Sequence, residues 1–158
     1  MRSRKPDGPT VDDPYRLARF VVAQNQGHSY ADALVEIRAG RKSSHWIWYV
    51  FPQLAGLASS ATSREYAISS LDEARSFLRH PVLGPRLCEI TAAANAHREK
   101  SARDIFGIDD VKFHSSMTLF LRASPADAPF REALAHFFAD EPDARTDALL
   151  AGDPPTPR

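Results

Sequence analysis

One short segment, residues 43–53, constrains the fold more than any other part of the chain. It holds both tryptophans, a tyrosine, a phenylalanine and a histidine. At about 100° per residue, a helix here would separate its side chains into an apolar arc and a second set that carries polar atoms. The apolar arc is Trp46, Ile47, Val50 and Phe51, and the second set is His45, Trp48 and Tyr49. Such a helix is too short to span a bilayer and too apolar for solvent. We therefore expect it in the middle of the protein, with one face toward a polar region.

The rest of the chain predicts helices throughout. Start signals such as Asp13-Pro14 and the capping box from Ser70 to Glu73 alternate with stop signals such as Pro52. We expect helices over about 13–26, 29–39, 44–51, 70–79, 83–97, 101–107, 109–122, 129–138 and 144–150. Residues 53–69 predict a loop with one helical turn. Because no segment alternates apolar and polar residues as a strand does, the fold class is all-α. We expect a single compact domain of about seven to nine helices, arranged as an orthogonal array or bundle.

Length and composition favour one folded domain. The chain has 158 residues, of which 43% are hydrophobic, enough for one core and too few for two. We expect a disordered leader over residues 1–12, the helical domain over 13–150 and a disordered tail over 151–158. Twenty basic residues balance twenty acidic ones, so no overall field attracts nucleic acid or an anionic membrane. The single cysteine, Cys88, and the lack of a signal-like or membrane-spanning run favour a cytoplasmic protein.

A second informative stretch lies at residues 111–122. On a helical wheel its larger apolar side chains share one face, while Ser115, Thr118 and Arg122 fall within about 60° of one another on the other. Val111 and Leu119 flank that polar face. Short hydroxyl donors and a planar guanidinium, framed by apolar side chains, can form a pocket for an anion or an amide. The alternative is structural, because Ser and Thr also permit close helix packing and Arg122 favours a helix end.

Other candidate ligand-binding residues are amides, cations and an aromatic ring that could orient, neutralise or stack on a bound molecule. They are Gln24, Trp48, Gln53, Arg64, Lys112 and His114. Each has a structural alternative, because buried amides usually satisfy main-chain groups, a loop arginine is often only exposed, and a tryptophan here can belong to the core.

His45 is the candidate catalytic residue, since the ordinary pKa of histidine lies near neutrality. A histidine at a helix start can instead be a buried hydrogen-bonding residue. The six histidines show no paired spacing typical of metal ligands, and Cys88 has no cysteine partner, so we expect no metal site. No glycine-rich phosphate loop, dinucleotide motif or nucleophile elbow is present, so the sequence predicts no cofactor.

Several motifs together resemble a known bacterial family. They are DPY at 13–15, RF at 19–20, Gln24, SHWIWYVFPQ at 44–53, ISSLDEA at 68–74, HPVLG at 80–84 and SSMTLF at 115–120. Over roughly residues 13–150 the chain resembles the Domain of Unknown Function 1810, whose members are sometimes labelled calpastatin. The resemblance implies a mainly helical single domain and brings no activity, cofactor or catalytic residue. The calpastatin label adds nothing, because those inhibitor repeats are disordered and this chain has a folded-domain pattern.

Three functions are compatible with these features. The first is binding of a polar small molecule containing a phosphate or a nucleotide, in a cleft between helix 44–51 and helix 111–122. Hydrolysis of a ribosyl or phosphoryl bond is the reaction to test first there. The second is a helical interaction module without chemistry, and the third, nucleic-acid binding, is disfavoured by the zero net charge. The expected partner is an anionic small molecule, with no membrane association.

Overall fold

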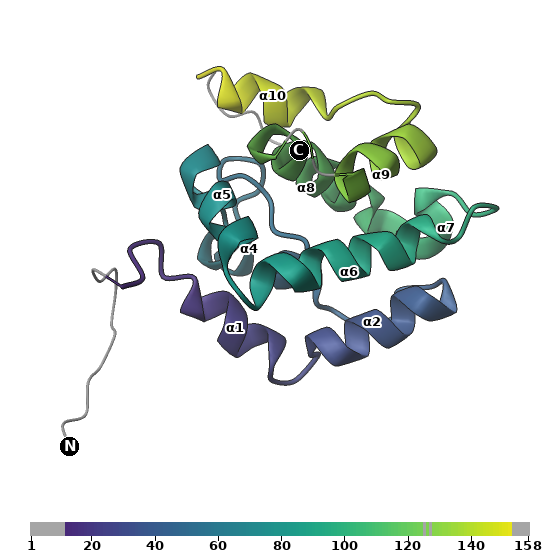
Figure 1. Cartoon of the computed structure of the whole chain (residues 1–158), viewed down its shortest axis with the longest axis horizontal. Helices are drawn as coiled ribbons and strands as arrows, with labels where there is room; N and C mark the ends of the chain where they lie inside the picture. Colours follow the sequence, from purple (N-terminus) through teal and green to yellow (C-terminus); the bar gives the residue numbers. More distant parts are fainter. Residues whose placement is uncertain (1–11, 125, 127, 153–158) are drawn as a thin grey trace.

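The computed structural model describes residues 12–124, 126 and 128–152. Over these residues the chain forms ten α-helices and one 3-10 helix (Figure 1). They are α1 (Ala18–Gln24), α2 (Tyr30–Ala39), α3 (Ile47–Val50), α4 (Ala61–Glu65), α5 (Leu71–Arg79), α6 (Leu83–Asn95), α7 (Ala102–Phe106), η1 (Gly107–Asp109), α8 (Asp110–Ala123), α9 (Ala128–Phe138) and α10 (Ala144–Leu150). The predicted leader and tail lie outside the described residues, apart from residues 12, 151 and 152.

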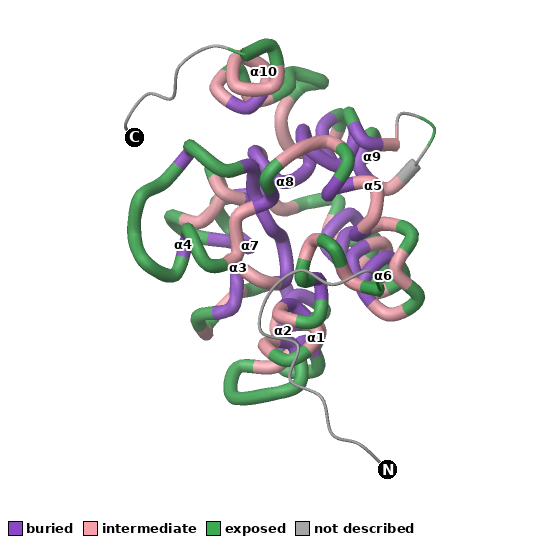
Figure 2. The backbone as a smooth tube through the Cα atoms, turned by 90° about the vertical axis from the view of Figure 1, so that its left-hand side faces the viewer, coloured by how far each residue is buried: buried purple, intermediate pink, exposed green. Residues whose placement is uncertain are grey.

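Helix α8 is the central element of the fold. It contacts α5, α7, α9 and α10, and side chains on every side of it are buried, including Phe113, Met117 and Phe120. A helix surrounded by other helices loses the usual polar outer face. Figure 2 shows the buried residues along α8 in the interior and exposed residues on the outer loops. The prediction of an all-α fold in a single compact domain is confirmed.

The aromatic segment lies in the middle of the protein, as its composition predicts. Trp46 and Phe51 have no exposed surface. The ring of Phe51 packs edge-on against Phe106, with centroids 5.6 Å apart, and against Phe113, at 5.1 Å. Aromatic pairs prefer this tilted geometry and contribute beyond the area they bury.

The aromatic helix is shorter than expected. Instead of spanning 44–51 it consists of the four residues of α3, and Trp46 before it has non-helical torsion angles. The reason is Glu36 of α2, whose carboxylate accepts the main-chain N–H groups of Ser43 and Ser44 at 2.8 and 3.0 Å. It also accepts the Trp46 indole N–H at 2.9 Å. These bonds hold the preceding segment in an irregular conformation.

The first helix also begins later than the Asp13-Pro14 signal suggested. Asp13 does cap main-chain groups, accepting the N–H of Leu17 at 2.7 Å and of Ala18 at 3.0 Å. Arg16, between Asp13 and Leu17, has a φ of 53°, in the left-handed region, and this conformation cannot continue a right-handed helix. Helix α1 therefore starts at Ala18 rather than near residue 13.

Candidate functional site

A closed loop projects from the helical body between α3 and α5. Its two ends are joined by main-chain hydrogen bonds, from the Ala55 N–H to the Ile68 carbonyl and from the Ile68 N–H to the Gln53 carbonyl, both 2.8 Å. Within the loop, the Ser60 hydroxyl caps α4 by accepting the N–H of Ser63 at 3.1 Å. We call residues 53–68 the pocket loop. Compact loops whose ends lie close together are often functional, because a rigid scaffold positions their side chains.

Arg19 and Glu73 hold the returning limb of the pocket loop. The Arg19 guanidinium donates to the carbonyls of Glu65 at 2.8 Å and Ala67 at 2.9 Å, and it pairs with Glu73 at 3.1 Å. Glu73 also accepts the main-chain N–H and the hydroxyl of Ser69. The two charged side chains are only 10% and 3% exposed. Because a buried charge has to be paired, this cluster ties the loop to α1 and α5.

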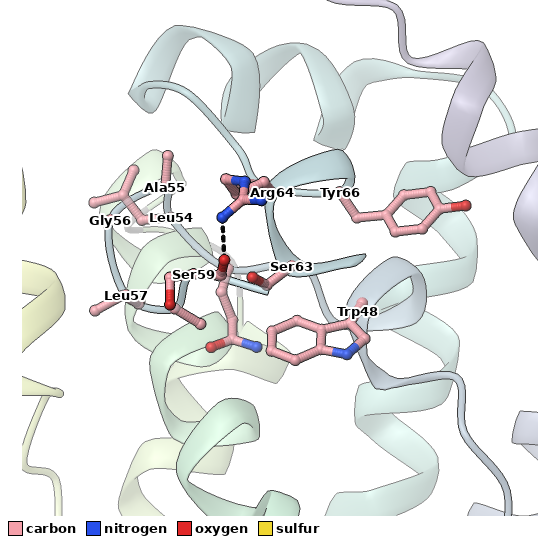
Figure 3. A pocket seen from close by; sticks show the side chains of 12 residues that line it. Trp48, Leu54, Ala55, Gly56, Leu57, Ser59, Ser63, Arg64 and Tyr66 are labelled. Carbon is pink, nitrogen blue, oxygen red and sulfur yellow. Dashed lines mark hydrogen bonds between the residues drawn. The ribbon is translucent and has the colours of Figure 1, made fainter. Parts of the chain in front are cut away.

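A pocket of about 400 Å³ lies inside the pocket loop and against α3 (Figure 3). Its wall combines aromatic rings, an amide, a guanidinium and residues 54–59. The side chains that matter for binding are Trp48, Gln53, Ser63, Arg64 and Tyr66. In Figure 3 the Arg64 guanidinium turns back to the carbonyl of Ser59, and Trp48 lies on the other side of Ser63. Three sequence candidates from separate positions, Trp48, Gln53 and Arg64, thus line one pocket.

The amide and the guanidinium of the pocket wall differ in burial. Arg64 is exposed, whereas Gln53 is 5% exposed. The side-chain nitrogen Nε2 of Gln53 has no hydrogen-bond acceptor among the described residues. Buried polar groups normally have partners, so this donor requires an explanation.

The aromatic wall is supported from behind. Tyr66 packs against Tyr49 at 5.4 Å and Phe20 at 5.8 Å. Burial and the nearby Glu65 carboxylate raise the pKa of Tyr66, so its hydroxyl stays neutral at physiological pH. Trp48 is half-buried, and the ammonium group of Lys112 lies 5.2 Å from its ring centroid. A cation over an indole face is an attractive contact that restrains the ring.

Asp109 places Lys112 beside this ring. Its carboxylate accepts from Lys112 at 3.0 Å and from Lys42 at 2.8 Å, and Lys42 also lies over the Trp46 ring at 5.0 Å. Burial alone would raise the pKa of Asp109, but the hydrogen bonds from the two lysines lower it below the ordinary value. The aromatic segment and the start of α8 do meet, through charged and aromatic side chains.

The polar face of residues 111–122 is covered by α10 and is not open to the expected cleft with the aromatic helix. That face packs instead against α10 and the residue that caps it. Thr118 accepts the main-chain N–H of Asp143 at 2.8 Å, and Ser115 donates to the Asp143 carboxylate at 3.1 Å. Arg122 forms a two-bond pair with Asp147, at 3.0 and 2.8 Å. These donors satisfy the protein itself, because α10 brings two carboxylates to the face that the wheel shows as open.

The remaining candidates also have structural partners. The Gln24 amide bridges α1 to its neighbours, donating to the Tyr49 carbonyl at 2.7 Å and accepting from Arg86 at 3.1 Å. His114 stacks on Phe138 at 3.9 Å, and one ring nitrogen lies 2.7 Å from the Glu141 carbonyl.

His45 is exposed rather than part of a site. Its ring lies 6.2 Å from that of His28, and it does not line the pocket. The described residues contain no group of three or more side chains arranged to hold a metal ion.

Several residues that shape the site had no strong signal in the sequence. Arg19, Glu36 and Glu73 connect segments far apart in the chain, and Ser63 lines the pocket. Glu73 could be recognised only as part of a helix cap, which hides its pairing with Arg19. A charged residue one position before a core aromatic, as Arg19 is before Phe20, was the one available hint.

Comparison with known proteins assigns the family but no activity. The chain matches the family described as "Protein of unknown function (DUF1810)" over residues 14–150, and it belongs to that family. It is also similar to the crystal structure of the conserved hypothetical protein Rv1873 from Mycobacterium tuberculosis. The two share 50% identity over 88% of this chain and 99% of the other, with a TM-score of 0.84. No curated protein matches the chain. No helix within the described residues is long and apolar enough to cross a membrane.

Proposed function

We propose that this protein binds a polar small molecule carrying a planar ring and a phosphate, such as a nucleotide, in the pocket-loop cavity. In this arrangement Trp48 covers the ring and Arg64 binds the phosphate. The ligand class is the one that the sequence favoured, but the site moves from the face of α8 to the pocket loop. We also infer a cytoplasmic location from the single cysteine, which would stay reduced there.

The charge of Arg64 is the observation that carries this proposal. Its guanidinium donates to a neutral acceptor, the Ser59 carbonyl, and it forms no ion pair with any described residue. Arg19 and Arg122, by contrast, are neutralised by carboxylates. An exposed guanidinium without a counter-ion, at the rim of a cavity, is well suited to a phosphate because its planar donors match two phosphate oxygens.

The size and lining of the cavity support the same ligand class. Its volume of about 400 Å³ falls within the range of small-molecule pockets. Trp48 and Tyr66 are half-buried and supply ring surface, while Gln53 and Ser63 supply polar atoms. Aromatic faces bind nucleobases with little dependence on sequence, since every base has a π face.

Binding, rather than hydrolysis, fits the residues of the wall. None of the described residues that line the pocket is an Asp, Glu, His, Lys or Cys. Hydrolysis of a ribosyl or phosphoryl bond usually relies on a carboxylate, imidazole or amine that accepts or donates a proton at the reacting atoms, and Tyr66 is the lining residue closest to that role. His45, the candidate for that role, lies outside the lining. We therefore assign the pocket to ligand binding or sensing.

The alternative functions have weaker support. An interaction module would use exposed apolar surface, and the large apolar side chains that the described residues expose are Val22, Val35, Ile108 and Val111. Ile108 in η1 and Val111 at the start of α8, 79% and 45% exposed, are close together in the chain. This patch covers about one helical turn, far less than a stable protein interface. Nucleic-acid binding has the zero net charge against it.

Thermal unfolding with nucleotides tests the proposal. AMP or UMP at about a hundredfold excess over its Kd should stabilise the protein by about 2.7 kcal/mol, because it binds only the folded state. For a chain of this size that corresponds to about 5–10 °C in Tm. Inorganic phosphate should produce a smaller shift, since it lacks the ring.

Two variants and a matched control identify the site. Arg64→Ala and Trp48→Ala should each abolish most of the shift. Arg75→Ala removes a guanidinium on α5 that is paired with Asp72 and lies outside the pocket lining, and it should leave the shift intact. Equal shifts in all variants, or no shift with any nucleotide in the parent protein, would refute the proposed function.

A further inference from the structure

Gln53 is placed as a recognition residue rather than as a structural one. Its main chain closes the base of the pocket loop, since its carbonyl accepts from Ile68 at 2.8 Å. Its side chain is 5% exposed and forms part of the pocket wall.

The Nε2 group of this amide is buried without an acceptor among the described residues. Leaving a buried donor unsatisfied destabilises a protein by more than a typical hydrogen bond stabilises it. Leucine would fill a similar volume without that cost. The amide at Gln53 therefore requires a reason other than stability of the free protein.

The other buried polar atoms without a partner do not raise the same question. Thr91 and Ser116 carry short hydroxyls within helices packed in the interior. Asn95 lines a hollow of about 170 Å³ and already donates to the Pro129 carbonyl at 3.1 Å. Gln53 alone among these four combines an unsatisfied donor with a cavity large enough for a metabolite.

We infer that Gln53 determines specificity by donating its Nε2–H to an acceptor on the edge of the ligand's ring. This assignment rests on the proposed function and narrows its ligand class. The ring must be a heterocycle with a carbonyl oxygen or an unprotonated ring nitrogen at its edge, as nucleobases have. A hydrocarbon ring bearing a phosphate would leave the donor unsatisfied and bind more weakly.

A wall of the pocket moves when such a ligand binds. The Nε2 atom has less than 1 Å² of exposed surface, so a ligand reaches it only after a neighbouring side chain shifts. Leu54 and Leu57 in the same wall are buried, at 6% and 2% exposure, whereas Trp48 is half-buried. Of these three side chains Trp48 can shift with the least loss of core packing, although the shift weakens its contact with Lys112. Its fluorescence reports the movement, because the Trp46 indole is hydrogen-bonded to Glu36.

Gln53→Leu and Gln53→Glu, titrated with AMP, UMP and phenyl phosphate, test this assignment. In the parent protein AMP or UMP should bind at least about tenfold more tightly than phenyl phosphate, which has the ring and the anion but no ring acceptor. Gln53→Leu should remove that preference while retaining or raising the Tm of the free protein. Gln53→Glu replaces the donor by an acceptor and should abolish nucleotide binding.

Gln24→Leu is the matched control, since Gln24 is also a buried glutamine but has both ends of its amide bonded. It should lower the Tm of the free protein and leave the preference for AMP or UMP over phenyl phosphate unchanged. A ¹⁵N spectrum provides a direct readout, because the Gln53 side-chain NH₂ signal should shift with AMP or UMP and not with phenyl phosphate.

The outcomes separate the two proposals. Two results together would overturn the role of Gln53 and leave the proposed function standing. They are tight nucleotide binding by Gln53→Leu and Gln53→Glu, and a Gln53 NH₂ signal in the parent protein that does not shift when nucleotide binds. No binding of any nucleotide by the parent protein would refute the proposed function and this assignment with it.

Discussion

Replacing Arg19 by alanine should both destabilise the protein and loosen the pocket loop. The Arg19 guanidinium uses its donors on the carbonyls of Tyr15, Glu65 and Ala67 and on the Glu73 carboxylate. Alanine removes all of these bonds at once. It also leaves the Glu73 carboxylate, which is 3% exposed, without its cation.

The magnitude follows from the burial of this pair. With side chains only 10% and 3% exposed, solvent screens the interaction weakly. Removing one partner of a buried pair typically costs about 3–5 kcal/mol, mostly because the other charge stays buried and uncompensated. Arg19→Lys should cost less, since an ammonium can pair with Glu73 but cannot reach the carbonyls as a fork does. The double variant Arg19→Ala/Glu73→Ala should cost less than the sum of the two single changes.

Urea unfolding followed by circular dichroism measures the free energy of unfolding. Arg98→Ala is the matched control, because its pair with Glu132 has side chains 71% and 48% exposed and should contribute at most about 1 kcal/mol. Amide hydrogen exchange at Ala55 and Ile68 should become faster in Arg19→Ala, since these amides close the pocket loop. If Arg19→Ala costs no more than Arg98→Ala and exchange at the loop base is unchanged, the role given to this pair is incorrect.

Three further predictions follow from the core, the titrating groups and α8. Phe51→Ala, at a fully buried ring 5.1 Å from Phe113, should cost about 3–5 kcal/mol in urea unfolding, and a loss below about 1 kcal/mol would contradict its place in the core. Burial alone would raise the pKa of Glu36, but hydrogen bonds from hydroxyl, main-chain and indole donors lower it overall. The stabilisation from Glu36 is therefore complete above the unfolded pKa of about 4.3 and is lost as the pH falls through the lower folded pKa. Glu36→Gln should make the free energy of unfolding depend less on pH below about pH 5. Parallel pH profiles for the variant and the parent protein would argue against this. Arg122→Ala, which removes a partly exposed pair with Asp147, should cost about 1 kcal/mol or less and preserve the nucleotide-induced Tm shift, while loss of that shift would return the site to α8.

The positions of the helices and the identity of several core residues could be predicted from the sequence, because both depend on the local pattern of apolar and capping residues. The Ser70 hydroxyl accepts the main-chain N–H of Glu73, as the capping signal predicts, and Gly40 ends α2 in the left-handed conformation with a φ of 89°. Trp46 and Phe51, in the predicted apolar arc, are fully buried. The periodicity of apolar residues indicates which face of a helix is buried, and that face does not depend on which element packs against it.

The candidate site was predictable only in part. Trp48, Gln53 and Arg64 could be selected as residue types suited to binding, but their convergence depends on the closure of the pocket loop between Ala55 and Ile68. The grouping of Ser115 and Arg122 as a pocket was incorrect because the wheel shows which side chains share a face and not which element covers it. Helix α10 comes from a part of the chain more than twenty residues away.

The sequence by itself determined that the chain is helical, that its aromatic segment is central, and which side chains are chemically able to bind a ligand. The tertiary structure decided which of those side chains remain available. Arg122 and Arg64 are the same residue type in segments that both suggest binding. Asp147 neutralises Arg122, whereas among the described residues Arg64 donates to the neutral Ser59 carbonyl and forms no ion pair. The physical reason is that pairing depends on distance in space, and a carboxylate many residues away satisfies a guanidinium as fully as a bound phosphate would.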